Sequence, residues 1–462
     1  MDDKTRHRSE TLVRRLADWI NTFAAAPVPP ATAERARAIL LDTLACALYA
    51  AADDKAASAI RTAERLSSDG ACTVIGTRLR TSLPLASFAN GVLIRTLDLN
   101  DTYTGPRQIG HPSDNIGAAL SAAELADRSG GELVRAIRMG YEIYGRILDL
   151  TNPDTPWDHV TVSGIVASAM TGWLLRLPAD RLAHAMALAA SHSATLGEVR
   201  VGHVSAAKSI ANSVVVQTAS LLTLLAADGV TGPGEALEGA RGYAKLIMEG
   251  ADFSTFFNEG ENADRVMSVG LKQYPCFALG QGPISAAVEL RKRLSAPADI
   301  ACLKVTVADT GPARLRLRDA LGRVPSSQEA ADYSLYFLVA VALLDGRFGL
   351  DQLTGGRWKD ADVRGLIERM EASIDPALKP TTALPSRLEA TLASGETIVV
   401  DRPATPGNPA MPLSWDEVKD KFRHCASGVI GESAQAAVID AVERIDTLPS
   451  VHALLDHLVP GR

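Results

Sequence analysis

The chain of 462 residues is too long for one ordinary hydrophobic core and long enough for two domains. Apolar residues make up 47% and charged residues 22%, which excludes a disordered or fibrous chain. The net charge of −7, with scattered lysines and arginines, argues against nucleic acid or an anionic membrane as a partner. Five widely spaced cysteines without a C-x-x-C motif argue against a disulfide scaffold, a zinc knuckle or an iron–sulfur cluster.

The first half of the chain predicts one helix after another, because apolar residues recur about every 3.6 positions. The predicted helices cover 10–23, 36–47, 83–94, 116–126, 131–148, 162–175, 179–194 and 205–227. The longest uncharged stretch, 209–227, is interrupted by polar residues that include Asn212, Gln217, Thr218, Ser220 and Thr223, so we expect a buried helix there and no membrane span. The N-terminus shows no apolar signal segment, and we expect a cytoplasmic protein.

The later part of the chain predicts a mixture of strands and helices. Alternating residues indicate a strand at 303–307, and 387–392 and 397–400 indicate a hairpin that turns at Ser394–Gly395. Helices are expected at 284–294, 330–344, 360–370, 415–423 and 434–445, with a Pro/Gly-rich linker at 405–412. The predicted fold is mostly α: a large all-α domain, 1–268 with 408–462, and an inserted α+β domain, 269–407.

The densest polar cluster lies at 96–103 and 110–115. Asp98, Asp101 and Thr102 are spaced so that a helical conformation would put them on one face. His111 precedes an apolar helix, where Ser113 or Asp114 could act as the N-cap. Each residue alone is explained as well by capping or solvation, but the cluster within fourteen residues favours a functional site.

Three further segments carry candidate residues. His159 stands at the entrance of a predicted helix. Arg200 and Lys208 flank the start of the uncharged helix, where the Lys208 ammonium either reaches outward to water or meets an anion. A third group stands at the junction of the two predicted domains, a suitable place for a cleft, and comprises Lys272, Tyr274 and Gln281.

Together these side chains suit a small polycarboxylate whose Cα proton is moved by a histidine or aspartate base. The residues alone leave dehydratase, decarboxylase and epimerase open. The kinase, P-loop, α/β-hydrolase, zincin and Rossmann motifs are absent from the sequence.

The order and spacing of several segments resemble the MmgE/PrpD family over nearly the whole chain. The segments are L-D-L-N-D-T-Y (97–103), G-H-P-S-D-N (110–115), D-H-V (158–160), the Lys208 segment, K-Q-Y-P-C (272–276), A-D-Y-S-L (331–335), V-A-V-A-L-L-D-G (339–346) and W-D-E-V-K-D-K-F (415–422). The resemblance implies an all-α domain, a smaller α+β lid, an active site in the cleft between them and a homodimer. It implies active-site positions for Asp98, Thr102, His111, His159, Lys208 and Lys272.

The leading hypothesis is a lyase without metal or cofactor that dehydrates a tricarboxylate, as 2-methylcitrate dehydratase of this family does. His111 would be the base, and Asp98 or Asp101 would orient it or assist the leaving hydroxyl. Lys208, Lys272 and Arg200 would hold carboxylates. A decarboxylase or epimerase on the same scaffold is the nearest alternative, and a non-catalytic helical interaction protein is the alternative from another class.

Overall fold

The computed structural model describes residues 11–67, 69–201, 204–258, 264–310, 313–314, 317, 323–378 and 383–461. The chain divides into two compact units. Unit 1 comprises Met1–Glu198, Ser209–Val269 and Ser414–Arg462, and unit 2 comprises Val199–Lys208 and Gly270–Leu413. Unit 2 therefore contains two stretches that lie outside the predicted α+β domain, namely Val199–Lys208 and residues 408–413.

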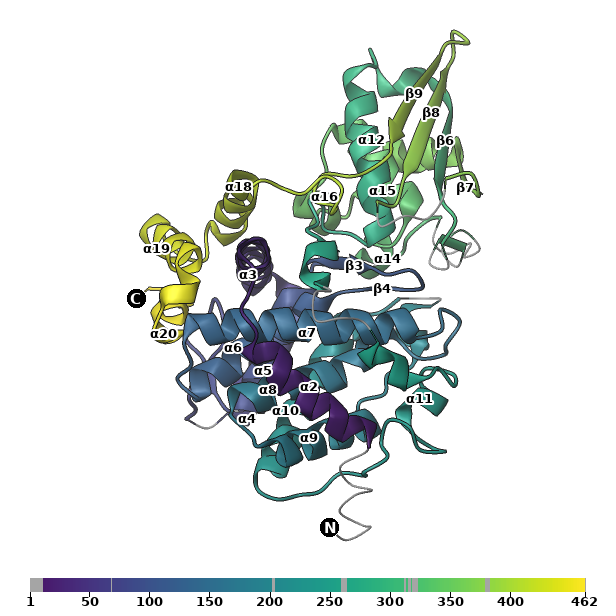
Figure 1. Ribbon diagram of the computed structural model, residues 1–462. Helices are drawn as coiled ribbons and strands as arrows, with labels where there is room; N and C mark the ends of the chain where they lie inside the picture. Colours follow the sequence, from purple (N-terminus) through teal and green to yellow (C-terminus); the bar gives the residue numbers. More distant parts are fainter. Residues whose placement is uncertain are drawn as a thin grey trace. The chain divides into compact units, whose positions relative to one another are not determined.

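Unit 1 is built mainly from helices (Figure 1). Its longer helices are α2 (Leu12–Ala25), α3 (Pro30–Ala51), α4 (Asp54–Leu66), α5 (Leu83–Arg95), α6 (Ile116–Leu125), α7 (Gly130–Leu150), α8 (Ser163–Leu174), α9 (Ala179–His192), α10 (Ala207–Ala227), α18 (Trp415–Ala426) and α19 (Glu432–Glu443). Shorter ones are α11 (Tyr243–Leu246) and α20 (His452–Leu455). The helices expected in these regions are confirmed to within a few residues at most ends, but α3 is much longer than expected and the sequence did not indicate α4.

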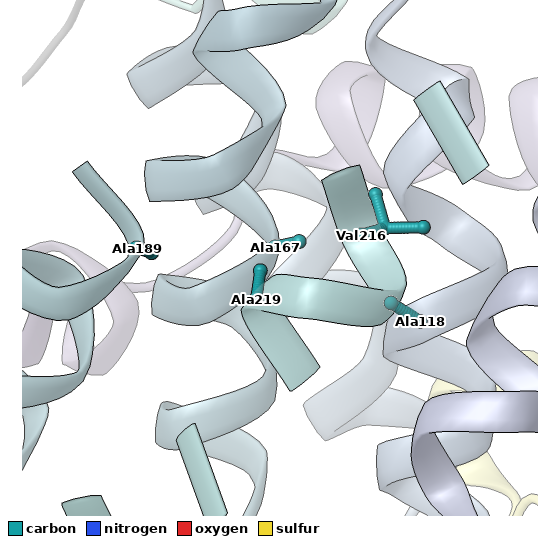
Figure 2. Packing of buried hydrophobic residues seen from close by; sticks show 5 residues of the cluster. All are labelled: Ala118, Ala167, Ala189, Val216 and Ala219. Atoms are coloured by element: carbon teal, nitrogen blue, oxygen red, sulfur yellow. The ribbon is translucent and has the colours of Figure 1, made fainter. Parts of the chain in front are cut away.

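Small side chains hold the core helices of unit 1 close together. Ala118 of α6, Ala167 of α8, Ala189 of α9 and Val216 and Ala219 of α10 form one fully buried cluster (Figure 2). Since dispersion contacts fall off steeply with distance, close approach of the helices compensates for the small size of each side chain. The alanine-rich composition thus yields a tightly packed helical unit.

Helix α10 is long and apolar enough to cross a membrane by length and composition alone. Half of its most apolar window is buried within the structure, and core helices of soluble proteins pass the same test. Its exposed positions include Ile210, Val214, Leu221 and Leu225. The helix is therefore weak evidence for a membrane span.

Unit 2 contains a four-stranded sheet in the order β7-β6-β8-β9 (Figure 1). The strands are β6 (Ile300–Ala308), β7 (Met370–Asp375), β8 (Ser386–Leu392) and β9 (Thr397–Arg402), and its longer helices are α12 (Gln281–Lys292), α15 (Leu335–Asp345) and α17 (Ala361–Glu368). The predicted hairpin is confirmed, with Leu388 opposite Val400 and Gly395 in the left-handed region at φ 89°. Helix α12 packs on β8 and β9.

Two helices expected in unit 2 are confirmed as elements, but each differs from the expectation at one end. The helix expected at 360–370 ends at Glu368, and Met370 opens the edge strand β7, which pairs with β6 in parallel. The helix expected at 330–344 is interrupted between α14 (Gln328–Ala331) and α15. The reason for the interruption is a cap: the Ser334 hydroxyl accepts a hydrogen bond from the Phe337 amide and starts a new helix.

Candidate functional site

The turn after α5 and the two short strands that follow it carry three of the predicted catalytic residues. The strands β3 (Thr102–Thr104) and β4 (Ile109–Gly110) pair antiparallel, with Tyr103 opposite Gly110. The expected helical arrangement of Asp98, Asp101 and Thr102 is wrong. The helix ends at Arg95, the backbone of Asp98 is left-handed with φ 49°, and Thr102 already belongs to β3. Aspartate tolerates the left-handed region better than most residues, so the chain can turn at this point.

The Asp98 carboxylate is buried beside a buried arginine. Arg95 Nη1 donates to Asp98 Oδ1 at 2.6 Å and also reaches the side-chain oxygen of Asn100. A second carboxylate, that of Asp114, lies 3.7 Å from Arg95 Nε. One buried guanidinium thus lies beside two acidic side chains and offsets part of their negative charge.

The Asp101 carboxylate is buried and receives its hydrogen bonds from neutral groups. Ser113 donates to Oδ1 through both its amide and its hydroxyl, and Tyr141 donates to Oδ2 at 2.7 Å. Burial raises the pKa of Asp101 to about 6, because these hydrogen bonds lower it by less than burial raises it. The carboxylate of Asp42 nearby adds to the rise. Asp101 is therefore an acid that titrates just below neutral pH.

His111 follows β4 and is buried against the same turn. The expectation that Ser113 or Asp114 caps the next helix is wrong, since both lie inside a 3-10 turn (Pro112–Asn115) and their side chains contact Asp101 and Asn100. Nδ1 of His111 lies 2.6 Å from the backbone carbonyl oxygen of Asp101. A carbonyl oxygen can only accept, so Nδ1 carries the proton and Nε2 of the neutral ring keeps its lone pair.

The structure brings His159 to His111. Their rings meet edge to face with centroids 5.5 Å apart. His159 opens a 3-10 turn (His159–Val162), and its Nδ1 lies 3.3 Å from the Asp158 carboxylate, which also caps that turn at the Val160 amide. A carboxylate in this position fixes the orientation of the ring.

Thr102, the first residue of β3, carries a buried hydroxyl. Its side chain is almost buried, and among the described residues Oγ1 has no hydrogen-bond partner. Buried polar atoms are nearly always paired in folded proteins, so this hydroxyl is a candidate for contact with a ligand.

In unit 2, Lys208 is paired with an acidic side chain of the protein. Its Nζ lies 3.0 Å from Asp332 Oδ1 and 3.6 Å from the centroid of the Tyr333 ring, and the side chain is only 3% exposed. Arg200 donates to the Tyr333 hydroxyl at 3.3 Å. Of the two alternatives for Lys208, the structure therefore selects contact with an anion, here a carboxylate together with an aromatic face.

Lys272 is buried at the start of a loop that Gln281 holds in place. The side-chain oxygen Oε1 of Gln281 accepts from the backbone amides of Gln273 and Tyr274, and its side-chain Nε2 donates to the backbone carbonyl oxygen of Tyr274. The ring of Tyr274 meets that of Phe348 edge to face, and burial raises the pKa of its phenol. Gln281 thus positions the loop, and its predicted contact with substrate stays a prediction.

Several residues that complete these two groups were not among the site residues predicted from the sequence. They are Arg95, Tyr141, Asp158, Asp332 and Tyr333. Asp332 and Tyr333 belong to the A-D-Y-S-L segment, but their pairing with Lys208 joins positions 124 residues apart. The interruption between α14 and α15 is the local feature that could have indicated a special role for this pair.

In the described part of the chain, no group of three or more His, Cys, Asp or Glu side chains is arranged to hold a metal ion. The expectation of a site without metal or cofactor is a prediction that a chelator experiment can test.

Comparison with known proteins defines the family. The model of the MmgE/PrpD N-terminal domain matches residues 14–255, and that of the MmgE/PrpD C-terminal domain matches residues 274–447. The chain belongs to the MmgE/PrpD family, which confirms the resemblance seen in the sequence.

Individual relatives within this family include two kinds of enzyme. The chain is 28% identical to 2-methylcitrate dehydratase of Cupriavidus necator over 79% of each chain. It is 25% identical to cis-aconitate decarboxylase of Aspergillus terreus over 96% of this chain and 95% of the relative, and 23% identical to that of Mus musculus over 92% and 89%.

Proposed function

We propose that this protein is a lyase that eliminates water from a small tricarboxylate such as 2-methylcitrate. The observation that carries the proposal is the edge-to-face pair of His111 and His159, each ring oriented by an oxygen acceptor at Nδ1. Elimination needs one group to remove a Cα proton and another to protonate the departing hydroxyl. The dehydratase relative adds support for this reaction class.

The two histidines suit different halves of the reaction. His111, with its proton held at Nδ1 by a carbonyl, presents Nε2 as the base that takes the Cα proton. His159, beside the Asp158 carboxylate, is suited to hold a proton and deliver it to the hydroxyl as the C–O bond breaks. The C–H electron pair becomes the new C=C bond, and water leaves.

The proposed roles of the remaining site residues follow from their charge. Thr102 offers a hydroxyl to the substrate, and Asp101 orients His111 through its backbone carbonyl. The cations Lys208, Lys272 and Arg200 are the proposed anchors for carboxylates and would stabilise negative charge that builds up when the Cα proton leaves.

The test is an absorbance assay for the unsaturated product with purified protein. We expect turnover of 2-methylcitrate or citrate, unaffected by a chelator, and a loss of about 100-fold or more in kcat for His111→Asn. His192→Asn is the matched control, since His192 ends α9 on the surface. No turnover of either acid at high enzyme concentration rejects the substrate class, and activity lost to the chelator rejects the metal-free mechanism.

A decarboxylase is the second candidate, because the decarboxylase relative from Aspergillus terreus matches 96% of this chain. Release of carbon dioxide from cis-aconitate would establish it. Exchange of substrate hydrogen with solvent deuterium without net elimination would establish an epimerase. If His111→Ala and Lys208→Ala fold normally and change no small-molecule binding, the proposed pocket is wrong, and a non-catalytic interaction protein becomes the favoured alternative.

The assembly and location are proposed on the resemblance alone. The proposed assembly is a homodimer, and the proposed location is the cytoplasm. The role of unit 2 as a lid and the active-site cleft are likewise proposed only from the family resemblance.

A further inference from the structure

A buried ion pair joins helix α18 to helix α3 in unit 1. Lys421 Nζ lies 2.6 Å from Asp42 Oδ1, and the side chains are 11% and 0% exposed. The same ammonium donates to the backbone carbonyl oxygen of Leu99 at 3.1 Å. Leu99 lies in the turn between Asp98 and Asp101, so one nitrogen atom connects three segments that are far apart in the chain.

We infer that Lys421 is a positioning residue that holds the turn at Asp98–Asp101 in the conformation needed for acid–base chemistry. The inference rests on the proposed function, because it assigns Lys421 to the reaction of that site. Its basis is geometric: the Lys421 ammonium donates to the Leu99 carbonyl, and Asp101, two residues further on, carries the backbone carbonyl that orients His111.

Stability alone does not account for this pair. Taking an ammonium and a carboxylate out of water costs free energy that their attraction only partly returns, and apolar residues often replace such pairs without loss. A lysine that also fixes a turn has a reason to be buried. Burial alone would lower the pKa of Lys421, but the adjacent Asp42 carboxylate keeps this pKa above its usual value. The ammonium therefore stays charged and can hold both Asp42 and the Leu99 carbonyl.

Lys421 also pairs with the carboxylate of Asp42, which raises the pKa of Asp101. The charged and titratable groups that face Asp101, its hydrogen-bond partners or Asp42 come from several elements: Arg35 and Asp42 of α3, Tyr141 and Tyr144 of α7, Lys421 of α18, and Asp114 and His111 of the segment after β4. Because the negative charge of Asp42 raises the pKa of Asp101, removing the Lys421 cation that pairs with Asp42 would change the electrostatics at Asp101.

The experiment separates positioning from stability with a pair of variants. Lys421→Met leaves Asp42 buried without its cation, and we expect a large drop in Tm. Asp42→Asn with Lys421→Met removes both charges, so we expect Tm to return close to that of the wild type. In this double variant nothing donates from position 421 to Leu99, so we expect kcat to stay about 10- to 100-fold low with little change in KM.

Hydrogen–deuterium exchange supplies a second readout, with faster exchange expected at the amides of 98–102 in the double variant. If that variant unfolds, Asp42→Asn with Lys421→Gln keeps a neutral donor and is measured in its place, with intermediate kcat and exchange expected. Lys419→Met is the control on the same helix, since Lys419 pairs with the exposed Asp416. Wild-type kcat and unchanged exchange in a double variant with restored Tm would overturn the inference. If the wild type turns over no tricarboxylate, the proposed function fails, and unchanged exchange at 98–102 still overturns the inference.

Discussion

Replacing Asp101 by asparagine should stabilise the protein at neutral pH. Burial raises the pKa of this carboxyl from 3.8 to about 6. A raised pKa means that the folded state favours the protonated form, so the contribution of Asp101 to stability is full below pH 3.8 and is lost as the pH rises through 6. At about 1.4 kcal/mol per pH unit, ionised Asp101 costs roughly 3 kcal/mol above pH 6.

Asparagine imitates the protonated form. Its oxygen can still accept from Ser113, and its amide can donate to the Tyr141 hydroxyl. Urea unfolding should therefore show Asp101→Asn to be more stable than the wild type by about 1–3 kcal/mol at pH 7.5 and little different at pH 4. Activity should fall at the same time, as is usual when a strained functional group is relieved.

The control is the same substitution at Asp252, an exposed residue. Hydrogen bonds from Ser254 lower the pKa of Asp252, so its ionised form stabilises the folded state above its unfolded pKa. Asp252→Asn should therefore show no gain in stability at pH 7.5. An Asp101→Asn variant that is less stable than the wild type by equal amounts at both pH values would refute the reasoning, because its hydrogen bonds would then outweigh burial.

Three further changes test the surroundings of the site. A Cβ in Gly110→Ala would overlap the Tyr144 hydroxyl, which accepts from the His111 amide, so we expect kcat to fall about tenfold and Tm to drop, as overpacking costs about 1–3 kcal/mol. Lys208→Met should lower the free energy of unfolding by about 3–5 kcal/mol in urea titrations, because a buried carboxylate loses its cation. Gln281→Glu replaces a donor that faces a backbone carbonyl, and a steady-state assay should show KM rising more than kcat falls.

Each of these changes has a contrasting control. Gly365→Ala adds a Cβ in α17 where nothing lies within 4 Å, and should raise stability slightly. Asp332→Asn added to Lys208→Met should recover much of the lost stability. An unchanged Tm for Lys208→Met alone would contradict the buried pair, and an unchanged KM for Gln281→Glu would show that the loop does not depend on this amide.

Local patterns predicted most helices, whereas the details of the site depended on tertiary contacts. The apolar period along α5 or α8 is set by residues a few positions apart, so it is visible in the sequence. The left-handed backbone of Asp98 and the pairing of Lys208 with Asp332 are not visible in the sequence, since each depends on contacts of the folded chain. The residue types of the site were visible, but their hydrogen bonds were not.

The distribution of charge around the turn in unit 1 argues that Asp101 is functional. Of the buried aspartates there, Asp42 lies against Lys421, and Asp98 and Asp114 lie against Arg95. In the described structure the hydrogen bonds to Asp101 come instead from a serine and a tyrosine, which are neutral. A buried carboxylate whose hydrogen bonds come only from neutral groups weakens the fold when it is ionised, in line with its raised pKa. Perturbed groups of this kind gather at sites that move protons, and here the group adjoins the carbonyl that sets the tautomer of His111.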